Sequence, residues 1–232
     1  MSSGGKPVVY ATEGHATSPI DRRKARTLRA LFSAFERLAG SLPLDELSVG
    51  ALAQAADINR VTFYSHFRNL DELVDRAVKA ALTESALAMK DPYVDPSATT
   101  EVAANIRAYI EALARHQALF AWVAQSSHRH RMNDLFFEGI LEIVAERSGL
   151  VSRLDPRPRE GGASPFSRKA ELFMKYSAAG IARMLLGFAL GEYSAQDIVL
   201  AEELLPSLWL PSAYEALGIP AGESLARSAR HL

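Results

Sequence analysis

The chain has 232 residues, of which 48% are apolar and 23% are charged, so we expect it to fold as one sizeable core or two small domains. Its formal net charge of -1 excludes a global electrostatic attraction to nucleic acid or membranes, so any such binding must rest on local placement of charge. The absence of cysteine excludes a disulfide framework, thiolate metal ligands and a cysteine nucleophile.

Residues 1–19 are mostly small and polar, lack periodicity and are predicted to form a flexible arm. The sequence has no apolar run near the ~20 residues that a bilayer span requires, and the arm lacks the basic and apolar regions of a secretory leader. We therefore expect a cytoplasmic protein that does not enter a membrane.

An amphipathic helix is predicted to begin near residue 19 and to end near Gly40. Ser18, Pro19 and Asp21 fit an N-cap, a first-turn proline and an acidic third residue. Apolar side chains then recur at spacings of three and four residues: Leu28, Leu31, Phe32, Phe35 and Leu38.

Three further helices are predicted before residue 82. Ser48 can cap a short helix, and Asn59 can cap another that runs to about Phe67. Asn69, with Glu72 three residues later, repeats the capping-box pattern and opens a longer helix with one apolar face. Residues 20–82 are therefore expected to form a four-helix unit.

The two short helices have the geometry of a helix-turn-helix, whose second helix enters the major groove of DNA. Phe63 and Phe67, four residues apart, are expected to anchor that helix to the core. The other side chains of the helix can then face outwards: Arg60, Val61, Thr62, Tyr64, Ser65 and His66. The alternative is that Tyr64 and His66 are a partly buried aromatic and a satisfied histidine of an ordinary small helix.

Several of these side chains suit DNA chemically. Arg60 can bind guanine with two hydrogen bonds, while Val61 and the methyl group of Thr62 can contact thymine. Donors suited to phosphate oxygens are present on Ser48, Tyr64 and His66. A basic cluster in the first helix can follow the DNA backbone or enter a minor groove: Arg22, Arg23, Lys24, Arg26 and Arg29. The alternative for this cluster is a solvated helix face.

Residues 95–218 are expected to form a second helical unit, after a hinge at residues 91–100 and before a tail at residues 219–232. Apolar periodicity predicts helices within residues 102–113, 119–123, 135–144, 172–188 and 194–210. Ser194 and Asp197 form a capping box for the last of them. No stretch has the sustained alternation of a strand, so the fold class is all-α.

Residues 22–80 resemble the tetracycline-repressor (TetR/AcrR) family of one-component bacterial regulators. The resemblance lies in "RRKARTLRALFSAFERLAG" as first helix, "LSVGALAQAADINR" as second helix and turn, "TFYSHF" at the end of the recognition helix and "NLDELV" at the start of the fourth. The resemblance implies that the last two long helices form a dimer interface. It also implies that the following residues face DNA: Ser48, Asn59, Arg60, Val61, Thr62, Tyr64, Ser65 and His66.

Two positions depart from the family pattern. Asp57 stands where a turn glycine is common, and we expect the turn to survive because Asp and Asn tolerate a positive φ best. Leu70 replaces a lysine at the start of the fourth helix, where a phosphate contact is expected. The amide groups of that helix N-terminus, or nearby Arg68, can take over this contact.

Aromatic side chains in the second unit can line an effector cavity of the kind such regulators have: Tyr109, Phe120, Trp122, Phe136, Phe137, Phe173 and Tyr176. The alternative is that they belong to an ordinary hydrophobic core.

The helix within residues 172–188 is apolar on more than one face and therefore favours a homodimer. Leu172, Phe173, Tyr176 and Met184 are predicted to serve the core of their own unit. A second stripe is predicted to pack against a two-fold mate: Ala178, Ile181, Leu185 and Phe188. The alternative is a central helix buried entirely within one protomer.

The sequence has no catalytic or metal-binding motif. "GESLA" at residues 222–226 is similar to G-x-S-x-G but ends in alanine instead of glycine. "HRHR" at residues 128–131 is predicted to be a solvated loop rather than a metal site, because residues two apart do not share a helix face. Glu142 and Glu146 are read as an exposed helix face rather than as an acid and base pair. We expect neither an enzyme nor a cofactor.

The sequence thus predicts a transcriptional regulator that binds a near-palindromic double-stranded DNA operator as a homodimer. It is predicted to act as a repressor that a small, mostly apolar effector releases. Two alternatives stay open: a constitutive or architectural DNA binder without effector, and an all-α enzyme or interaction module with a vestigial helix-turn-helix.

Overall fold

The computed structural model describes residues 19–39, 41–89, 99–147 and 168–217. These ranges form helices joined by short turns, and their only strand-like pairing is an isolated bridge between Ala39 and Leu42. The predicted all-α class is therefore confirmed. The predicted arm up to Ser18, the hinge at residues 91–98 and the tail at residues 219–232 lie outside the described residues.

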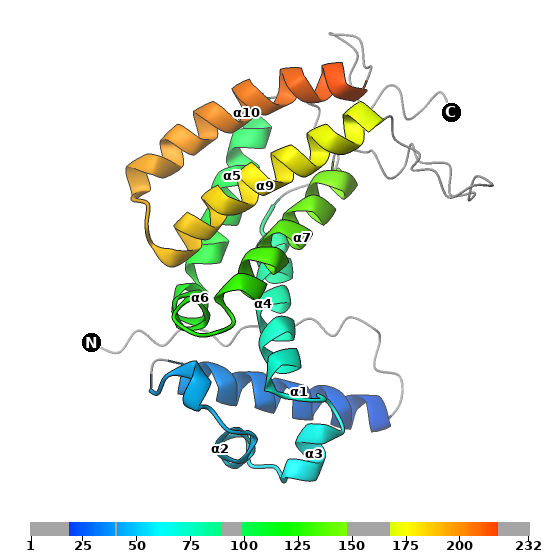
Figure 1. The fold of residues 1–232 in the computed structure, drawn as a ribbon, viewed down its shortest axis with the longest axis vertical. Coiled ribbons are helices and arrows are strands. Elements are labelled where there is room, and N and C mark those ends of the chain that lie inside the picture. Colours follow the sequence, from blue (N-terminus) through cyan, green and yellow to red (C-terminus); the bar gives the residue numbers. More distant parts are fainter. Residues whose placement is uncertain (1–18, 40, 90–98, 148–167, 218–232) are drawn as a thin grey trace, which may run out of the picture.

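The N-terminal helices form a small unit at one end of the molecule (Figure 1). Its elements are α1 (Pro19–Leu38), the 3-10 turn η1 (Leu44–Glu46), α2 (Val49–Ala55), α3 (Arg60–Tyr64) and the first turns of α4 (Leu70–Leu87). The predicted third helix is shorter than expected. It ends at Tyr64 because the N–H of His66 bonds back to the carbonyl of Phe63 at 2.9 Å, which tightens the chain into a turn before Phe67.

The predicted N-caps of α2, α3 and α4 are confirmed, while Ser18, the predicted cap of α1, lies outside the described residues. A side-chain oxygen accepts a hydrogen bond from the N–H three residues later at Ser48 (3.1 Å), Asn59 (2.7 Å) and Asn69 (2.9 Å). The capping box at Asn69 is a variant, because the Glu72 carboxylate accepts from the backbone N–H of Arg68 at 2.8 Å.

The turn between α2 and α3 depends on Asp57, whose φ is 55°. The N–H of Ile58 donates to the carbonyl of Ala53 at 3.0 Å, and the N–H of Asp57 donates to that of Gln54 at 3.1 Å. This pair of bonds is a Schellman motif, with aspartate where glycine is usual. The expectation that the turn tolerates Asp57 is confirmed.

The second unit consists of α5 (Thr99–Ala114), α6 (Gln117–Ala124), α7 (Arg129–Arg147), α9 (Arg168–Leu190) and α10 (Ala195–Leu217). Helix α7 packs against α9, and α10 packs against α5. The predicted capping box of α10 is confirmed, since the Asp197 carboxylate accepts from the N–H and the hydroxyl of Ser194, both at 2.7 Å.

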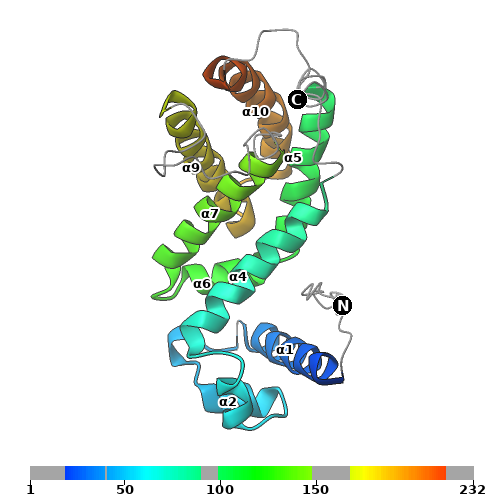
Figure 2. The same ribbon diagram turned by 90° about the vertical axis from the view of Figure 1, so that its right-hand side faces the viewer.

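Helix α4 belongs to both units (Figure 2). Its N-terminal turns lie beside α1 and α3, and its C-terminal part packs against α5 and α7. The buried side chains form one continuous hydrophobic cluster from Leu31 in α1 to Ala201 in α10. Helix α4 therefore links the helix-turn-helix to the second unit through one core. No described helix combines the length and the apolar character needed to cross a membrane.

The sequence-based assignment of the two apolar stripes of α9 is wrong for several residues, although Phe173 and Met184, predicted to serve the core, are partly buried. Leu172, also predicted to be core, is 52% exposed. Ala178 is 0%, Leu185 is 4% and Phe188 is 8% exposed, so these side chains lie in the core of the protomer, and Ile181 is partly buried. Tyr176, predicted to be core, is 80% exposed. Periodicity identifies two apolar stripes on such a helix but does not indicate which one its own neighbours cover.

Other large apolar side chains are open to solvent on α9 and α10, two helices that run side by side (Figure 1). We call these side chains together the α9–α10 face. Its large side chains, each about half exposed or more, are Leu172, Tyr176, Val199, Leu200 and Leu204. Gly180 lies on the same helix, also exposed, and a Cβ atom built there would meet nothing within 4 Å.

Candidate nucleic-acid interface

Helix α3 is fixed by the aromatic anchors that the sequence predicts. Phe63 is 0% and Phe67 is 1% exposed, and their ring centroids lie 5.6 Å apart. Phe67 also packs edge-on against Phe32 of α1, with centroids 5.9 Å apart. The opposite side of α3 is open, with Val61 77% and Tyr64 57% exposed. The short helix is thus held rigidly while its outer face is free to contact a partner.

Some of the predicted contact residues also stabilise this local structure. The Asn59 carboxamide oxygen accepts from both the N–H and the hydroxyl of Thr62, the latter at 2.9 Å. The Ser65 hydroxyl donates to the Thr62 carbonyl at 2.7 Å. Ser48, the cap of α2, is exposed. Among the described residues, these bonds leave the Asn59 amide N–H groups, the Thr62 methyl group and the Ser48 hydroxyl hydrogen for contact with a partner.

His66 lies at the end of the recognition helix and is partly buried. Burial lowers the pKa of its imidazole, and the positive charges of Arg76 and Lys24 lower the pKa further. The ring is therefore neutral near pH 7 and has one N–H to donate. The alternative interpretation, an ordinary small helix, expects Tyr64 to be a partly buried aromatic. More than half of Tyr64 is exposed, so it does not fit that expectation.

The predicted basic cluster lies at the exposed start of α1, with Arg22, Arg23 and Lys24 all open to solvent. The effect of Lys24 on the His66 pKa indicates that this end of α1 lies close enough to α3 for their charges to interact. The cluster and the outer face of α3 can therefore meet the same stretch of DNA.

Arg68 is only partly available for the phosphate contact that is expected at the start of α4, where Leu70 stands. Its side chain is 90% exposed, but its Nε donates to the Glu72 carboxylate at 3.1 Å. Sequence reasoning missed a second cation, Arg76 of α4, whose guanidinium lies 5.0 Å from the Phe67 ring centroid and donates to the His66 carbonyl at 3.3 Å. A residue ten positions after His66 gives no local signal of this contact.

Three polar contacts connect the start of α7 to the N-terminal unit, and we call them the interdomain clasp. The Ser127 hydroxyl donates to Asp45 at 2.6 Å, and the Arg131 guanidinium donates to Asp75 at 2.9 Å. The third contact joins His128 Nε2 to Asp71 at 3.0 Å.

The prediction that residues 128–131 form a solvated loop is therefore wrong. Arg129 begins α7, and the side chains of His128 and Arg131 bind carboxylates of α4. Within the described residues, no three His, Asp or Glu side chains gather to hold a metal ion.

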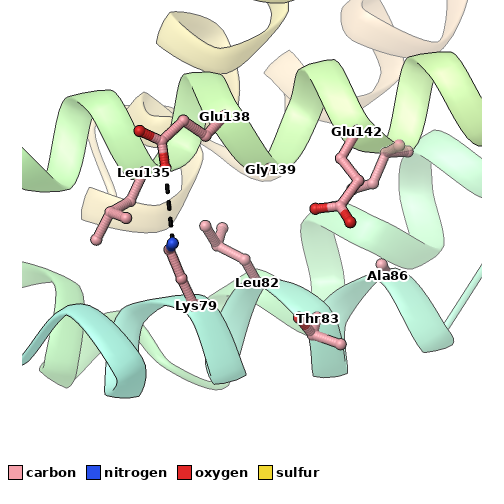
Figure 3. A pocket seen from close by; sticks show the side chains of 9 residues that line it. Lys79, Leu82, Thr83, Ala86, Leu135, Glu138, Gly139 and Glu142 are labelled. Atoms are coloured by element: carbon pink, nitrogen blue, oxygen red, sulfur yellow. Dashed lines mark ion pairs between the residues drawn. The ribbon is translucent and has the colours of Figure 1, made fainter. Parts of the chain in front are cut away.

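A pocket of about 330 Å³ lies between α4 and α7 (Figure 3). Lys79 reaches across it from α4 to Glu138 of α7, with 3.7 Å between the charged atoms. The remaining lining combines apolar and polar groups: Leu82, Thr83, Ala86, Leu135, Gly139, Glu142 and Ile143.

None of the seven aromatic residues predicted to bind an effector lines this pocket. Phe120 and Phe136 are fully buried and stack edge-on at 5.1 Å, while Tyr176 lies on the α9–α10 face. Trp122 contacts the N-terminal unit instead. The other three are a buried Tyr109 and partly buried Phe137 and Phe173. The structure does not bring the seven together around one described cavity.

In the interior of the second unit, some polar atoms have no hydrogen-bond partner among the residues that the structure describes: the Tyr109 hydroxyl, His116 Nε2 and Glu84 Oε2. His116 Nε2 lies 3.9 Å from Glu84 Oε2, beyond hydrogen-bond distance. Burial lowers the pKa of His116 to about 4 and raises the pKa of Glu84 and of Tyr109. Sequence reasoning missed Glu84 and His116, because neither belongs to a motif.

No protein-family model and no curated protein matches the sequence. Among solved structures, the dihydroxyacetone kinase operon activator DhaS matches 83% of this chain and 96% of its own, with a TM-score of 0.52 and 17% identity. This likeness shows a shared fold.

Two further structures are similar over nearly their whole length. The TetR-family repressor AlkX from Dietzia sp. strain DQ12-45-1b, implicated in biodegradation of n-alkanes, matches 87% of this chain and 98% of its own at 17% identity, with a TM-score of 0.46. A TetR-family transcriptional regulator from Haemophilus influenzae matches 82% and 98% at 15% identity, with a TM-score of 0.31.

Proposed function

We propose that this chain is a DNA-binding transcriptional regulator of the TetR type. The observation that carries the proposal is the outer face of α3, where Val61 and Tyr64 stand exposed on a short helix anchored by Phe63 and Phe67. A rigid helix with open polar and apolar side chains, beside an exposed basic cluster, is what major-groove readout requires. The fold shared with the DhaS activator supports this function.

The regulator acts as a homodimer through the α9–α10 face. Exposed Tyr176 of α9 and exposed Leu200 and Leu204 of α10 form an apolar surface on neighbouring helices, which a monomer would leave in water. Pairing the two helices with their two-fold mates buries this surface, and open space at Gly180 permits close approach. The same symmetry directs two recognition helices to the half-sites of a near-palindromic operator.

A small effector in the second unit weakens operator binding, so the chain is a repressor that its ligand releases. The pocket between α4 and α7 has a volume within the range of small-molecule sites. A ligand there must favour one position of α4 over another, because differential affinity is the only means of shifting a conformational equilibrium. Since α4 also carries the helix-turn-helix, the shift changes the spacing of the recognition helices.

Buried polar atoms in the interior of the second unit favour a regulator that responds to an effector over a DNA binder that has none. A fully packed structural domain satisfies its buried polar atoms, whereas Glu84, Tyr109 and His116 each have one such atom without a partner in the described part of the chain. In this proposal residues 20–82 bind DNA, residues 95–218 bind the effector and dimerise, and the protein acts in the cytoplasm without an enzymatic centre.

Selection from a library of random DNA duplexes tests the proposal. The wild-type chain should enrich a near-palindromic sequence, and Val61→Asp, which places a negative charge on the outer face of α3, should abolish the enrichment. Val61→Thr is the matched control, because it keeps the shape of the side chain and adds no charge. Failure of the wild type to enrich any sequence, even at low salt, would sink the proposal.

A further inference from the structure

Gly50 and Arg60 meet where the first turn of α2 faces the first turn of α3. A Cβ atom built on Gly50 would lie 2.5 Å from Nη2 of Arg60, and 3.2 Å from both Cζ and Nε. The flat guanidinium therefore rests directly against the bare backbone of α2. Any side chain at position 50 would occupy space that the guanidinium now holds.

We propose that Gly50 is a positioning residue for base recognition: it forms a notch that orients the Arg60 guanidinium towards the major groove. This inference rests on the proposed function. Arg60 is exposed, and no described residue holds its guanidinium in an ion pair or a hydrogen bond, so its charge is free for DNA. What restrains the long side chain is contact with Gly50.

Such restraint matters because arginine recognises guanine through two parallel hydrogen bonds in a fixed plane. An arginine that is free to rotate loses conformational entropy when it takes up this geometry, and a partly oriented one loses less. The notch therefore strengthens the correct contact more than it strengthens general attraction to phosphate.

The backbone does not itself require glycine at position 50. Gly50 lies within helix α2, where the conformation suits any L-residue and alanine is a better helix former. By contrast, Gly191 has a φ of 74° and needs glycine for that reason. What glycine provides at position 50 is space for Arg60.

Gly50→Ala is the direct test, because its methyl group displaces only the far end of a flexible side chain. Dissociation constants are measured for the selected operator and for each of its single-base-pair variants. The wild type, Gly50→Ala, Arg60→Ala and the double variant are compared, and the melting temperature of each is recorded.

Gly50→Ala should reduce discrimination roughly threefold to tenfold at the base pair where Arg60→Ala also reduces it. Affinity for random DNA and the melting temperature should not fall. The double variant should discriminate no worse than Arg60→Ala alone, because the added methyl group then meets no guanidinium. Ala51→Ser, which adds one atom to the next, exposed residue of α2, should behave as the wild type.

The inference is overturned if Gly50→Ala discriminates between base pairs as well as the wild type does, or if its loss of discrimination is spread evenly over the operator. It is also overturned if the losses add in the double variant, or if Ala51→Ser has an equal effect. A protein that prefers no DNA sequence at all would instead disprove the proposed function. The two failures are thus distinguishable.

Discussion

The indole N–H of Trp122 donates a hydrogen bond to the backbone carbonyl of Leu42 at 2.7 Å, across the boundary between the two units. The same ring packs against Phe35 of α1, with centroids 4.9 Å apart. Together with the interdomain clasp, this contact joins α6 and the start of α7 to the helix-turn-helix unit. The orientation of the recognition helix therefore depends on residues more than 50 positions away in the sequence.

Trp122→Phe should lower the free energy of unfolding by about 1 kcal/mol or more, because the Leu42 carbonyl loses its donor while aromatic packing on Phe35 is largely kept. Urea denaturation measures the change. An unchanged midpoint in Trp122→Phe would mean that the bond contributes nothing to stability.

Arg60→Ala should relax discrimination at one operator base pair by roughly 1 to 3 kcal/mol, whereas Tyr64→Phe should weaken binding to all sequences alike. Arginine reads a base edge, while the exposed tyrosine hydroxyl can only donate to a phosphate in this account. Fluorescence anisotropy with operator variants separates the two effects. Equal losses on operator and random DNA for both substitutions would remove Arg60 as a base reader.

Tyr176→Arg and Leu204→Arg should each convert a dimer of about twice 25.3 kDa into monomers, because both place a charge on the α9–α10 face. Light scattering at micromolar concentration reports the mass. Leu87→Arg is the matched control, since Leu87 is 68% exposed but lies on α4. Leu185→Arg is expected to unfold the protomer instead, because Leu185 is buried. A monomeric wild type contradicts the predicted dimer.

The free energy of unfolding should fall as the pH is lowered from about 7 to about 5, by roughly 2 kcal/mol from His116 alone. Burial lowers the pKa of His116 to about 4, so between that value and the ordinary histidine pKa the unfolded chain binds more protons than the folded one. Protonation of Glu84, whose pKa burial raises, partly offsets this loss.

The pH series is measured by urea denaturation of the wild type and of His116→Gln. The substitution should flatten the dependence on pH, while the exposed His130→Gln serves as the control for removal of a histidine. A wild-type slope retained in His116→Gln would show that another group causes the acid sensitivity.

The features that the sequence predicted correctly depend on local structure. Ser48, Asn59 and Asn69 cap their helices because a side-chain oxygen three residues before an N–H needs no distant partner. Asp57 adopts its positive φ for an equally local reason, namely the Schellman turn that ends α2. The anchors Phe63 and Phe67 follow from helical spacing within one short segment.

The features that escaped prediction depend on contacts between distant segments. The partners of His128 and Arg131 lie 57 and 56 residues away, so their charges looked solvated in the sequence. Helix α9 has two apolar stripes, and only its packing in the protomer reveals that Leu185 faces inwards and Tyr176 outwards. The pocket likewise depends on how α4 and α7 are paired.

Sequence-specific DNA binding is tested by titrating the wild-type protein, at about 0.15 M salt, with the selected duplex and with a scrambled duplex of equal length. Two chains should bind each selected duplex, at least ~10³-fold more tightly than the scrambled one. Equal affinity for the two duplexes, or no binding to either at low salt, would contradict the account of this chain as a sequence-specific DNA-binding regulator.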